Sequence, residues 1–317
     1  MKKELMKILA CPKCKSNLKV DNISEKNGEI KTGTLKCVKC NSYYPIKNYI
    51  PRFVKRDEYV SSFSYEWWRH KKTQFDSYTG TKETEETFKE KTGFDLNKLK
   101  GSLVLDAGCG TGRFMEIVLN HRAKVVGVDL SFSVDVAQKN VGLNKNANIV
   151  QADIFNLPFK ECVFDYIFSI GVLHHTPDTK KAFFSLIPFL KNGGEIAIWV
   201  YSNEGLYMKI FNKSSDFWRF FTTRISQEKL YKFCKVYANL VYPLKKIRGL
   251  RAILQILLPP TSYHPNKIWR ILDTFDWLSP KYQWKHSYKE VYSWFDEAGL
   301  KDIKILSFPV ALKGKKT

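Results

Sequence analysis

Two short segments carry the residues best suited to chemistry. The apolar run Leu103-Val104-Leu105 passes into Asp106-Ala107-Gly108-Cys109-Gly110-Thr111-Gly112, a turn with glycines at alternate positions. Glycine has no Cβ, so a ligand can approach this main chain closely. A second apolar run ends at Asp129, roughly 20 residues further on, where nucleotide-binding folds place the carboxylate that holds ribose hydroxyls. The spacing departs from the G-x-G-x-x-G of dinucleotide sites. Together the segments predict a ribose-containing ligand at a tight turn.

Further motifs follow these two in a set order. With them the chain resembles the class I S-adenosylmethionine-dependent methyltransferases, in the broad group that includes the ubiquinone and menaquinone enzymes. The matching segments are Leu103 to Gly112, Val126 to Ser131, Gln151-Ala152-Asp153, Phe164 to Ile167, Gly171-Val172-Leu173-His174-His175 and Leu190-Lys191-Asn192-Gly193-Gly194.

The resemblance implies S-adenosylmethionine as cofactor and assigns roles to three carboxylates. Asp106, with the turn from Gly108 to Gly112, would face the methionine part; Asp129 would accept from both ribose hydroxyls; Asp153 would accept from the adenine amino group. Carboxylates suit these roles because they accept several charge-assisted hydrogen bonds. A strand-end cap is the alternative for Asp106 or Asp153. The further cofactor contacts expected from the resemblance are Ala107, Cys109, Gly110, Gly112, Leu130, Ile154 and Ile170.

Two histidines follow the fourth expected strand and are the candidates for catalysis. Methyl transfer from a sulfonium is an in-line displacement, so alignment and desolvation can carry most of it. A base is needed only when the acceptor carries a proton. His174 and His175 would face the methyl group, and neutral imidazole is a suitable base near pH 7. A helix-start or core-packing role remains the alternative for either residue.

Four of the seven cysteines form two C-x-x-C pairs, Cys11-Pro12-Lys13-Cys14 and Cys37-Val38-Lys39-Cys40. Such spacing predicts four thiolates around one structural Zn²⁺, with no open position for catalysis. Disulfides or unconnected thiols are the alternative. Together with Leu18, Tyr43 to Ile46 and Ile50 to Phe53, the pairs resemble the small zinc-ribbon domain that activates certain tRNA and protein methyltransferases as a separate subunit. Here it stands in the same chain.

Strands and helices alternate between the motifs, which predicts an α/β fold: a Rossmann-like, seven-stranded, doubly wound sheet. We expect strands at 103–106, 125–129, 149–152, 166–170 and 195–201, with helices at 113–120, 133–143 and 180–190, the last closed by Gly193-Gly194. A capping box at Ser287 to Glu290 begins a late helix, and strands at 302–306 and 310–312 complete the sheet. The predicted domains are a zinc ribbon (1–56), a helical cap or linker (57–100) and the methyltransferase domain (101–317).

Residues 202–286 form a long helical insertion after the fifth strand and are predicted to be a substrate lid, because ligands in open α/β sheets bind outside the carboxyl ends of the strands. A packed helical subdomain is the alternative. The expected contacts from the cap are Tyr65, Trp68 and Gln74. Those from the lid are Asp216, Trp218, Arg219, Arg224, His264, Asp273, Asp276, Tyr282 and His286.

The charge balance bears on partners. The net charge of +21, from 52 Lys and Arg against 31 Asp and Glu, favours polyanions such as RNA. Against that, the lysines are scattered, and the one dense run is Lys245-Lys246-Ile247-Arg248 with Arg251. Beside Leu250, Ile253 and Leu254 this run could rest on an anionic membrane surface, although a packed amphipathic helix is the ordinary explanation. No segment approaches the ~20 apolar residues of a membrane span, and we expect a cytoplasmic protein.

The sequence therefore predicts an S-adenosylmethionine-dependent methyltransferase acting on a small-molecule, lipid-like or saccharide acceptor. Motifs typical of nucleobase amino-group and pyrimidine C5 methylation are absent from the sequence. The alternative is an rRNA or tRNA methyltransferase that uses the zinc ribbon and the basic surface. A non-catalytic partner of another methyltransferase is a third reading, and the intact cofactor residues Gly110 and Asp129 argue against it.

Overall fold

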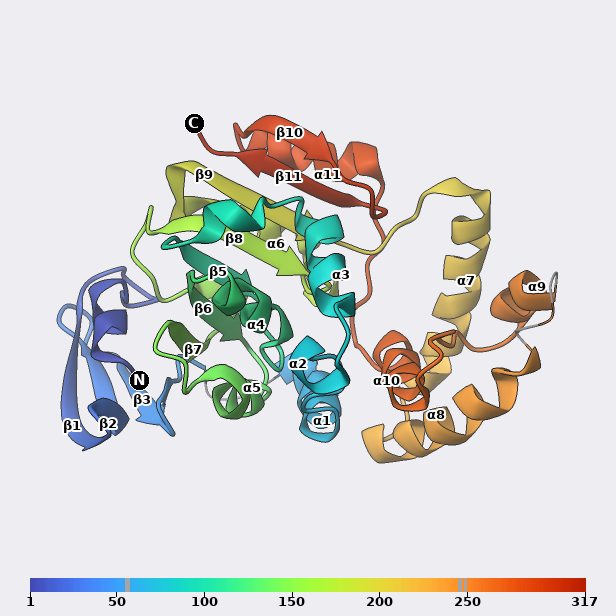
Figure 1. Cartoon of the computed structure of the whole chain (residues 1–317), viewed down its shortest axis with the longest axis horizontal. Helices are drawn as coiled ribbons and strands as arrows, with labels where there is room; N and C mark the ends of the chain where they lie inside the picture. The colour runs from blue at the N-terminus through green and yellow to red at the C-terminus, as the bar shows by residue number, and fades with distance from the viewer. Residues whose placement is uncertain (55–57, 245–246, 248–249) are drawn as a thin grey trace.

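The computed structural model describes residues 1–54, 58–244, 247 and 250–317. A central sheet with helices on both faces is flanked by a small N-terminal sheet on one side and by a group of helices on the other (Figure 1). The dense basic run of the sequence analysis is described only at Ile247 and Arg251, so most of it lies outside these residues.

The N-terminal sheet is antiparallel, with strands β1 (Leu18–Lys26), β2 (Glu29–Cys37), β3 (Tyr43–Lys47) and β4 (Ile50–Pro51) in that order. Asn27-Gly28 joins β1 to β2, and both residues have positive φ, as a two-residue hairpin turn requires. A short 3₁₀ helix, Lys3–Lys7, precedes the sheet.

The central sheet, as far as the described residues go, has seven strands in the order β10-β11-β9-β8-β5-β6-β7. The strands from β9 to β7 run parallel, whereas β11 pairs antiparallel with both β9 and β10. The expected fold class is confirmed. The strands are β5 (Leu103–Ala107), β6 (Lys124–Asp129), β7 (Ala147–Gln151), β8 (Phe164–Ile170), β9 (Leu190–Trp199), β10 (Lys301–Ile305) and β11 (Ala311–Lys315).

Each face of this sheet has its own apolar core. One core holds residues of α3 (Glu83–Thr92), α4 (Arg113–Asn120) and α5 (Val134–Val141), with Phe88, Phe114 and Phe168 in edge contact. The other holds residues of α6 (Thr179–Phe184), α11 (Tyr288–Glu297) and the N-terminal sheet. The N-terminal sheet therefore shares a hydrophobic core with the central domain and packs directly against it.

One expected helix is too long. The sequence analysis placed a helix at 180–190 and its C-terminal cap at Gly193-Gly194, but α6 ends at Phe184 and both glycines lie in β9. Pro188 lacks an N–H and disfavours a helical residue before it, so only a short 3₁₀ turn, Ile187–Phe189, follows. Gly193, with φ +81°, lies where the pairing of β8 and β9 shifts register. By contrast, Ser287 caps α11 as expected, accepting from the N–H of Glu290.

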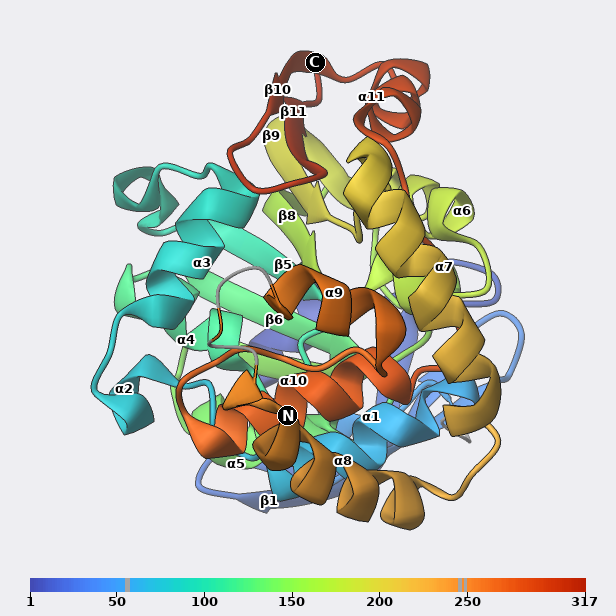
Figure 2. The same ribbon diagram turned by 90° about the vertical axis from the view of Figure 1, so that its right-hand side faces the viewer.

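The insertion at 202–286 is helical, as expected, with α7 (Gly205–Thr222), α8 (Gln227–Val241), α9 (Leu250–Leu257) and α10 (Lys267–Leu278). Figure 2 shows these helices in front of the sheet, with α1 (Ser61–Arg69) beside them and α2 (Asp76–Thr79) near α3. Leu230, Cys234, Phe275 and Leu278 form a small core between α8 and α10. Among the described residues, no helix combines the length and apolar character needed to cross a bilayer.

Candidate active site

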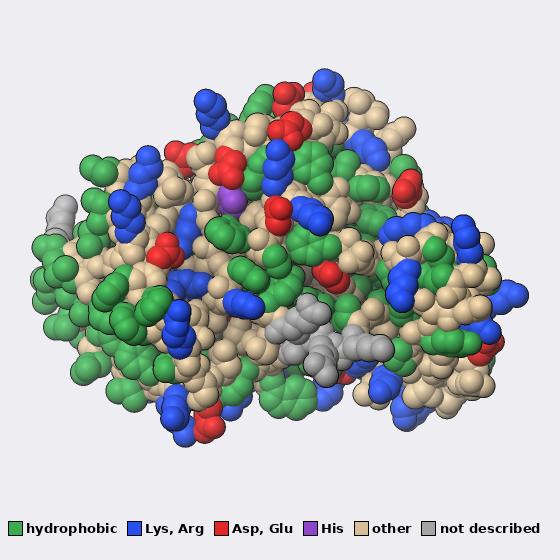
Figure 3. All heavy atoms as spheres, turned by 180° about the vertical axis from the view of Figure 1, so that it is seen from behind, with side chains coloured by type: hydrophobic (Ala, Val, Ile, Leu, Met, Phe, Trp, Pro, Cys, Tyr) green, Lys and Arg blue, Asp and Glu red, His purple; other side chains and the backbone are tan. Residues whose placement is uncertain are grey.

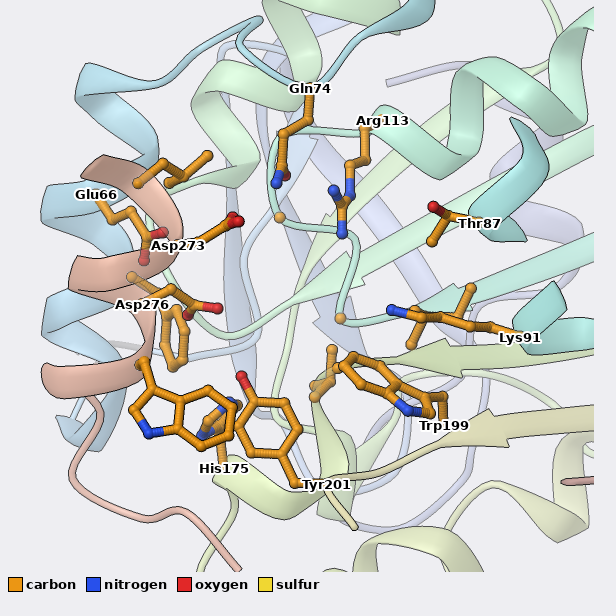
Figure 4. A pocket seen from close by; sticks show the side chains of 18 of the residues that line it. Glu66, Gln74, Thr87, Lys91, Arg113, His175, Trp199, Tyr201, Asp273 and Asp276 are labelled. Carbon is orange, nitrogen blue, oxygen red and sulfur yellow. The ribbon is translucent and has the colours of Figure 1, made fainter. Parts of the chain in front are cut away.

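A cavity of about 660 Å³ lies between the carboxyl ends of the central strands and helices α7, α9 and α10 of the insertion. We keep the name lid for the insertion at 202–286. Three parts of the chain line it. The segment before the sheet contributes Glu66, Trp67, Gln74 and Lys91, the strand ends contribute the glycine turn, and the lid contributes Tyr207, Asp273, Asp276 and Trp277. Figure 4 shows Glu66, Asp273 and Asp276 on one wall, across the cavity from Lys91 and Trp199.

The glycine turn forms the floor of the cavity. β5 ends at Ala107, and Gly108, Gly110 and Gly112 all have positive φ. A Cβ at Gly108 would lie 2.3 Å from a methyl of Val172, so no other residue fits there. The N–H groups of Gly108 and Cys109 donate to the carbonyl of Val128, which ties the turn to β6. Bare main chain is thereby presented to the cavity.

Asp129 closes β6 and lines the same cavity. Its Oδ2 accepts from the N–H of Gly110 at 2.9 Å, and its Oδ1 accepts from the N–H and Oγ of Ser131 at 2.8 and 2.6 Å. A carboxylate offers about four lone-pair sites, so one remains for a ligand. Asp129 therefore both shapes the turn and faces the cavity.

Asp106 lies beneath the turn, 1% exposed, and does not line the cavity. Within the described chain its Oδ2 has no hydrogen-bond partner. Burial, with Asp129 nearby, raises the pKa of Asp106 well above its usual range.

The other expected cofactor residues divide into two sets. Cys109, Leu130, Ile154 and Ile170 line the cavity with Ala107, Gly108, Gly110 and Asp129. Asp153 and Gly112 do not. The side chain of Asp153 caps a short 3₁₀ helix, accepting from the N–H of Phe155, and Gly112 is the N-cap residue of α4.

The two histidines occupy different environments. His175 lines the cavity, and its Nδ1 lies 2.8 Å from the carbonyl oxygen of Tyr282. A carbonyl only accepts, so Nδ1 carries the proton and Nε2 keeps its lone pair in the neutral ring. Burial lowers the pKa of His175 to about 3. His174 is fully buried against Tyr201, with ring centroids 3.9 Å apart, and does not line the cavity.

Several charged residues of the cavity were not singled out from the sequence. Glu66 on α1 is fully buried, and neither of its oxygens has a hydrogen-bond partner in the described chain. Burial, reinforced by Asp276 and Asp273, raises the pKa of Glu66 well above its usual range. Among the described residues, Arg113 at the start of α4 and Lys91 on α3 are the Lys and Arg side chains that line the cavity, and burial lowers the pKa of both. The sequence pattern gave no indication that these three side chains would face one cavity.

The lid contacts expected from the sequence are only partly brought together. Asp273 and Asp276 line the cavity, and burial raises their pKa values to about 6 and about 7. Gln74 of the cap also lines it, whereas Trp68 is 51% exposed and Tyr65 packs against the α8–α10 core. Six expected lid contacts do not line the cavity: Asp216, Trp218, Arg219, Arg224, His264 and His286. Tyr282 does not line it either, but its carbonyl oxygen contacts His175.

A second site lies in the N-terminal sheet. The sulfur atoms of Cys11, Cys14, Cys37 and Cys40 all lie within 4.8 Å of one another. The Cys11–Cys40 and Cys14–Cys37 sulfur pairs are 3.6 and 3.4 Å apart. Tetrahedral Zn–S bonds of about 2.3 Å would separate sulfurs by about 3.8 Å, so the cluster has about the size of a four-thiolate zinc site.

Comparisons with known proteins agree with both sites. A model described as "Trm112p-like protein" matches residues 2–48, and one described as "Methyltransferase domain" matches residues 105–198. Both resemblances drawn from the sequence are thereby confirmed.

Curated relatives match part of the chain. The "Probable tRNA methyltransferase 9B" of Mus musculus is 34% identical over 108 residues, which is 33% of this chain and 23% of that protein. The tRNA (carboxymethyluridine(34)-5-O)-methyltransferase of Arabidopsis thaliana is 36% identical over 107 residues, 33% and 25% of the two chains. The 24-methylenesterol C-methyltransferase 3 of the same plant is 29% identical over 152 residues, 45% and 42%.

The chain thus spans less than half the length of these relatives. Both family matches fall on segments whose geometry is described above, the four-cysteine sheet and the strands that carry the glycine turn. One chain therefore carries a segment similar to Trm112p-like proteins and, after it, a segment similar to methyltransferase domains.

Proposed function

We propose that this chain is an S-adenosylmethionine-dependent methyltransferase. The observation that carries the proposal is a set of buried acceptor atoms on cavity-lining residues that lack partners in the described chain: both oxygens of Glu66 and Oε1 of Gln74. Unsatisfied buried acceptors are costly, so they suit a ligand that brings positive charge and N–H donors. S-adenosylmethionine has an ammonium and a sulfonium group.

The cofactor-binding residues that we propose follow from this arrangement. Asp129 would accept from one ribose hydroxyl through its remaining lone pair, where the sequence analysis expected it to accept from both. Gly108 and Gly110 would lie against the methionine part, and Arg113 would pair with its carboxylate. Asp153 stays our proposal for the adenine amino group, with Leu130, Ile154 and Ile170 around the base. Zn²⁺ would be held by the four clustered cysteines, and the domain boundaries at 56 and 100 also remain predictions.

When bound, S-adenosylmethionine supplies a methyl group already activated by the sulfonium charge. The chain's own task is then to align the acceptor and exclude water. Tyr201 and Trp277, stacked with centroids 4.7 Å apart, wall the cavity with aromatic surface. If the acceptor must lose a proton, we propose Nε2 of His175 and the carboxylate of Asp276 as the two candidate bases. The pKa of about 7 makes Asp276 the stronger base of the two near neutral pH, whereas that of His175 is about 3.

For the acceptor we propose RNA. Two of the relatives described above are named as tRNA methyltransferases, one of them as probable. The net charge of +21 also favours a polyanion, because basic side chains release counterions from phosphates. This is the second reading of the sequence analysis, and the relatives support it better than the small-molecule acceptor that stood first.

A lipid-like acceptor is a second candidate, favoured by one specific observation. The cavity lies beneath the lid helices and is walled by aromatic rings, among them Trp199, Tyr201 and Trp277. Such a cavity suits an apolar acceptor that enters whole. The sterol methyltransferase among the relatives has this kind of substrate in its name.

The test is transfer of labelled methyl from S-adenosylmethionine into total RNA and total lipid extract of the same cells. We expect nuclease-sensitive label, and its loss with Asp129→Asn. Label in the solvent-extractable fraction would replace RNA by the lipid-like acceptor. If calorimetric titration with S-adenosylhomocysteine gives no saturable heat, the proposal that the chain is an enzyme is wrong. The chain would then be better explained as a non-catalytic partner of another methyltransferase.

A further inference from the structure

The lid helix α7 exposes an apolar stripe along its outer side. Leu206, Ile210, Phe217, Phe220 and Phe221 follow one another at steps of four, seven, three and one residues and are 43–76% exposed. That spacing puts them on one side of a helix. The opposite side, with Phe211, Ser215 and Arg219, is buried. An amphipathic helix in a monomer ordinarily turns its apolar side toward the core. Helix α7 has a second apolar side that faces solvent.

The neighbouring helices repeat this pattern. On α8, Phe233, Val236 and Leu240 also recur at helical spacing and are 39–71% exposed, while Leu230 and Cys234 face the core. On α9, Ile253 and Leu257 are more than half exposed, and none of its eight residues is buried. We call these ten residues of α7, α8 and α9 the outer lid surface.

The outer lid surface lies at the end of the molecule opposite the N-terminal sheet. Figure 2 views this end directly, with α7, α8 and α9 in front. In Figure 3 hydrophobic side chains gather over the lid end, at the left, with Lys and Arg among them. Contiguous exposed apolar patches of this kind mark interaction sites in proteins.

Basic residues accompany the apolar ones. Residues 202–286 contain fifteen Lys and Arg against five Asp and Glu, and two of those acids, Asp273 and Asp276, face the internal cavity. Lys209 and Lys213 on α7, with Lys281 and Lys285, line a groove of about 770 Å³ whose other walls include Leu206, Ile210 and Phe220. Lys285 pairs with Asp216; Lys209, Lys213 and Lys281 have no ion pair within the described chain. Apolar and cationic groups therefore share one surface.

We propose that the outer lid surface docks on an anionic lipid bilayer. Aliphatic and aromatic side chains projecting among lysines are the composition of helices that lie in the membrane interface. Binding of a nucleic-acid strand would instead use aromatic platforms along a basic groove, whereas six of these ten residues are Leu, Ile or Val, which provide no stacking surface. Charge complementarity favours lipid headgroups over a second copy of this basic chain.

The same helices reach the active-site cavity. Tyr207 of α7 donates through its hydroxyl to Oε1 of Gln255 on α9 at 2.6 Å, and both residues line the cavity. Docking of α7 and α9 would therefore place this wall of the cavity at the bilayer. The proposal does not depend on which acceptor is methylated.

Flotation of the full chain with vesicles tests the proposal. We expect binding to phosphatidylglycerol-containing vesicles, weaker binding to pure phosphatidylcholine, and loss of binding at high salt. F217S/F220S should reduce the partition coefficient at least tenfold, and K209E/K213E should remove the preference for anionic vesicles. All four side chains are exposed, so the fold should survive; far-ultraviolet circular dichroism checks this. The matched controls are Leu143→Ser, 94% exposed on the α5–β7 turn, and K301E/K304E on β10.

Three results would overturn the proposal. One is equal flotation of wild type and F217S/F220S, or none for either. Another is a concentration-dependent dimer that F217S/F220S abolishes, which would make the surface an interface between copies. The last is single-stranded RNA binding that F217S/F220S weakens as strongly as vesicle binding. Titration with S-adenosylhomocysteine separates these outcomes from failure of the proposed activity, because cofactor binding should be unchanged in every lid variant.

Discussion

Asp129 is the residue on which the proposed cofactor site depends most. Asp129→Asn keeps the volume but removes the charge that the ribose hydroxyl would meet. We expect the Kd for S-adenosylhomocysteine to rise roughly 10- to 100-fold, since hydrogen bonds to a charged group contribute about 1.5–3 kcal/mol. Isothermal titration calorimetry measures it.

Asp178→Asn is the matched control, because Asp178 caps α6 through the N–H of Lys181 and lies outside the cavity. Affinity within twofold of wild type in both variants would show that the ribose does not lie against Asp129.

We expect substitutions of the two adjacent histidines to have different effects, one on catalysis and one on stability. His175→Gln is expected to lower kcat by about 10²–10⁴-fold if the acceptor carries a proton, because the lone pair at Nε2 is lost, while cofactor affinity stays the same. His174→Gln should instead lower the melting temperature, since His174 packs in full burial against Tyr201. Steady-state kinetics and calorimetry together distinguish the two. A large kcat effect from His174→Gln alone would reverse the assignment.

The sequence alone could not show which of His174 and His175 lines the cavity and which packs in the core. Both follow the same strand, and only the contact with the Tyr282 carbonyl, more than a hundred residues away, fixes the orientation of His175. Glu66 shows the same limit, because its burial arises from packing against lid helix α10, whose Asp276 and Asp273 raise its pKa. Asp129 could be found because its role follows from a local strand end.

At the scale of elements, the N-terminal sheet is predicted to depend on zinc. Cys14→Ser should release about one equivalent of metal per chain and destabilise the ribbon, because structural zinc supplies much of such a domain's folding free energy. Plasma emission spectroscopy measures the metal. Cys162→Ser is the control, since Cys162 is exposed and lies outside the cluster. Metal-free wild-type protein would contradict the prediction.

The ribbon also docks on an edge of the central sheet. Arg52 pairs with Gln151 of β7 and with Asp135 of α5 at 2.7 and 2.6 Å, and the N–H of Phe53 donates to the carbonyl of Gln151. Because the guanidinium is largely buried, we expect Arg52→Met to lower the free energy of unfolding by about 2 kcal/mol.

Urea titration measures the cost of Arg52→Met. Lys89→Met, which breaks the exposed pair with Glu85 on α3, should cost less than about 0.5 kcal/mol. Equal effects would mean that the ribbon contact is no stronger than an ordinary surface pair.

Elements with a regular pattern were predictable, and those set by distant contacts were not. Helix α4 begins and ends at the residues expected from the glycine turn and the apolar spacing. The start of β9 was missed because Gly193-Gly194 is typical of a helix end. Its place in a strand follows from pairing with β8 and from Lys316, whose carbonyl accepts from the N–H of Gly193.

Across the whole molecule, buried charges from the cap, the sheet and the lid meet at one cavity. Asp276 has its pKa raised to about 7 by burial and by Asp273, with Arg113, Arg219 and Lys91 opposing the shift. In the unfolded chain the same carboxyl titrates near its ordinary value of 3.8. Between these values the folded protein holds a proton that the unfolded chain has released, so this group makes unfolding easier as pH rises.

Other titratable groups change stability with pH in the opposite direction, so the effect of Asp276 must be measured by comparison with a variant. Burial lowers the pKa of Lys91 and brings that of the Met1 amino group to about 5, and both shifts favour folding as pH rises. The pH dependence of the wild-type free energy of unfolding therefore reports on all of these groups together. The difference in this free energy between Asp276→Asn and wild type isolates the contribution of Asp276. We expect Asp276→Asn to gain stability relative to wild type as pH rises from about 4 to 7, by up to about 4 kcal/mol for a shift of about three pKa units, and then to level off. Urea titrations at four pH values would measure this, and a difference that is flat or falls with pH would show that Asp276 ionises freely in the folded protein.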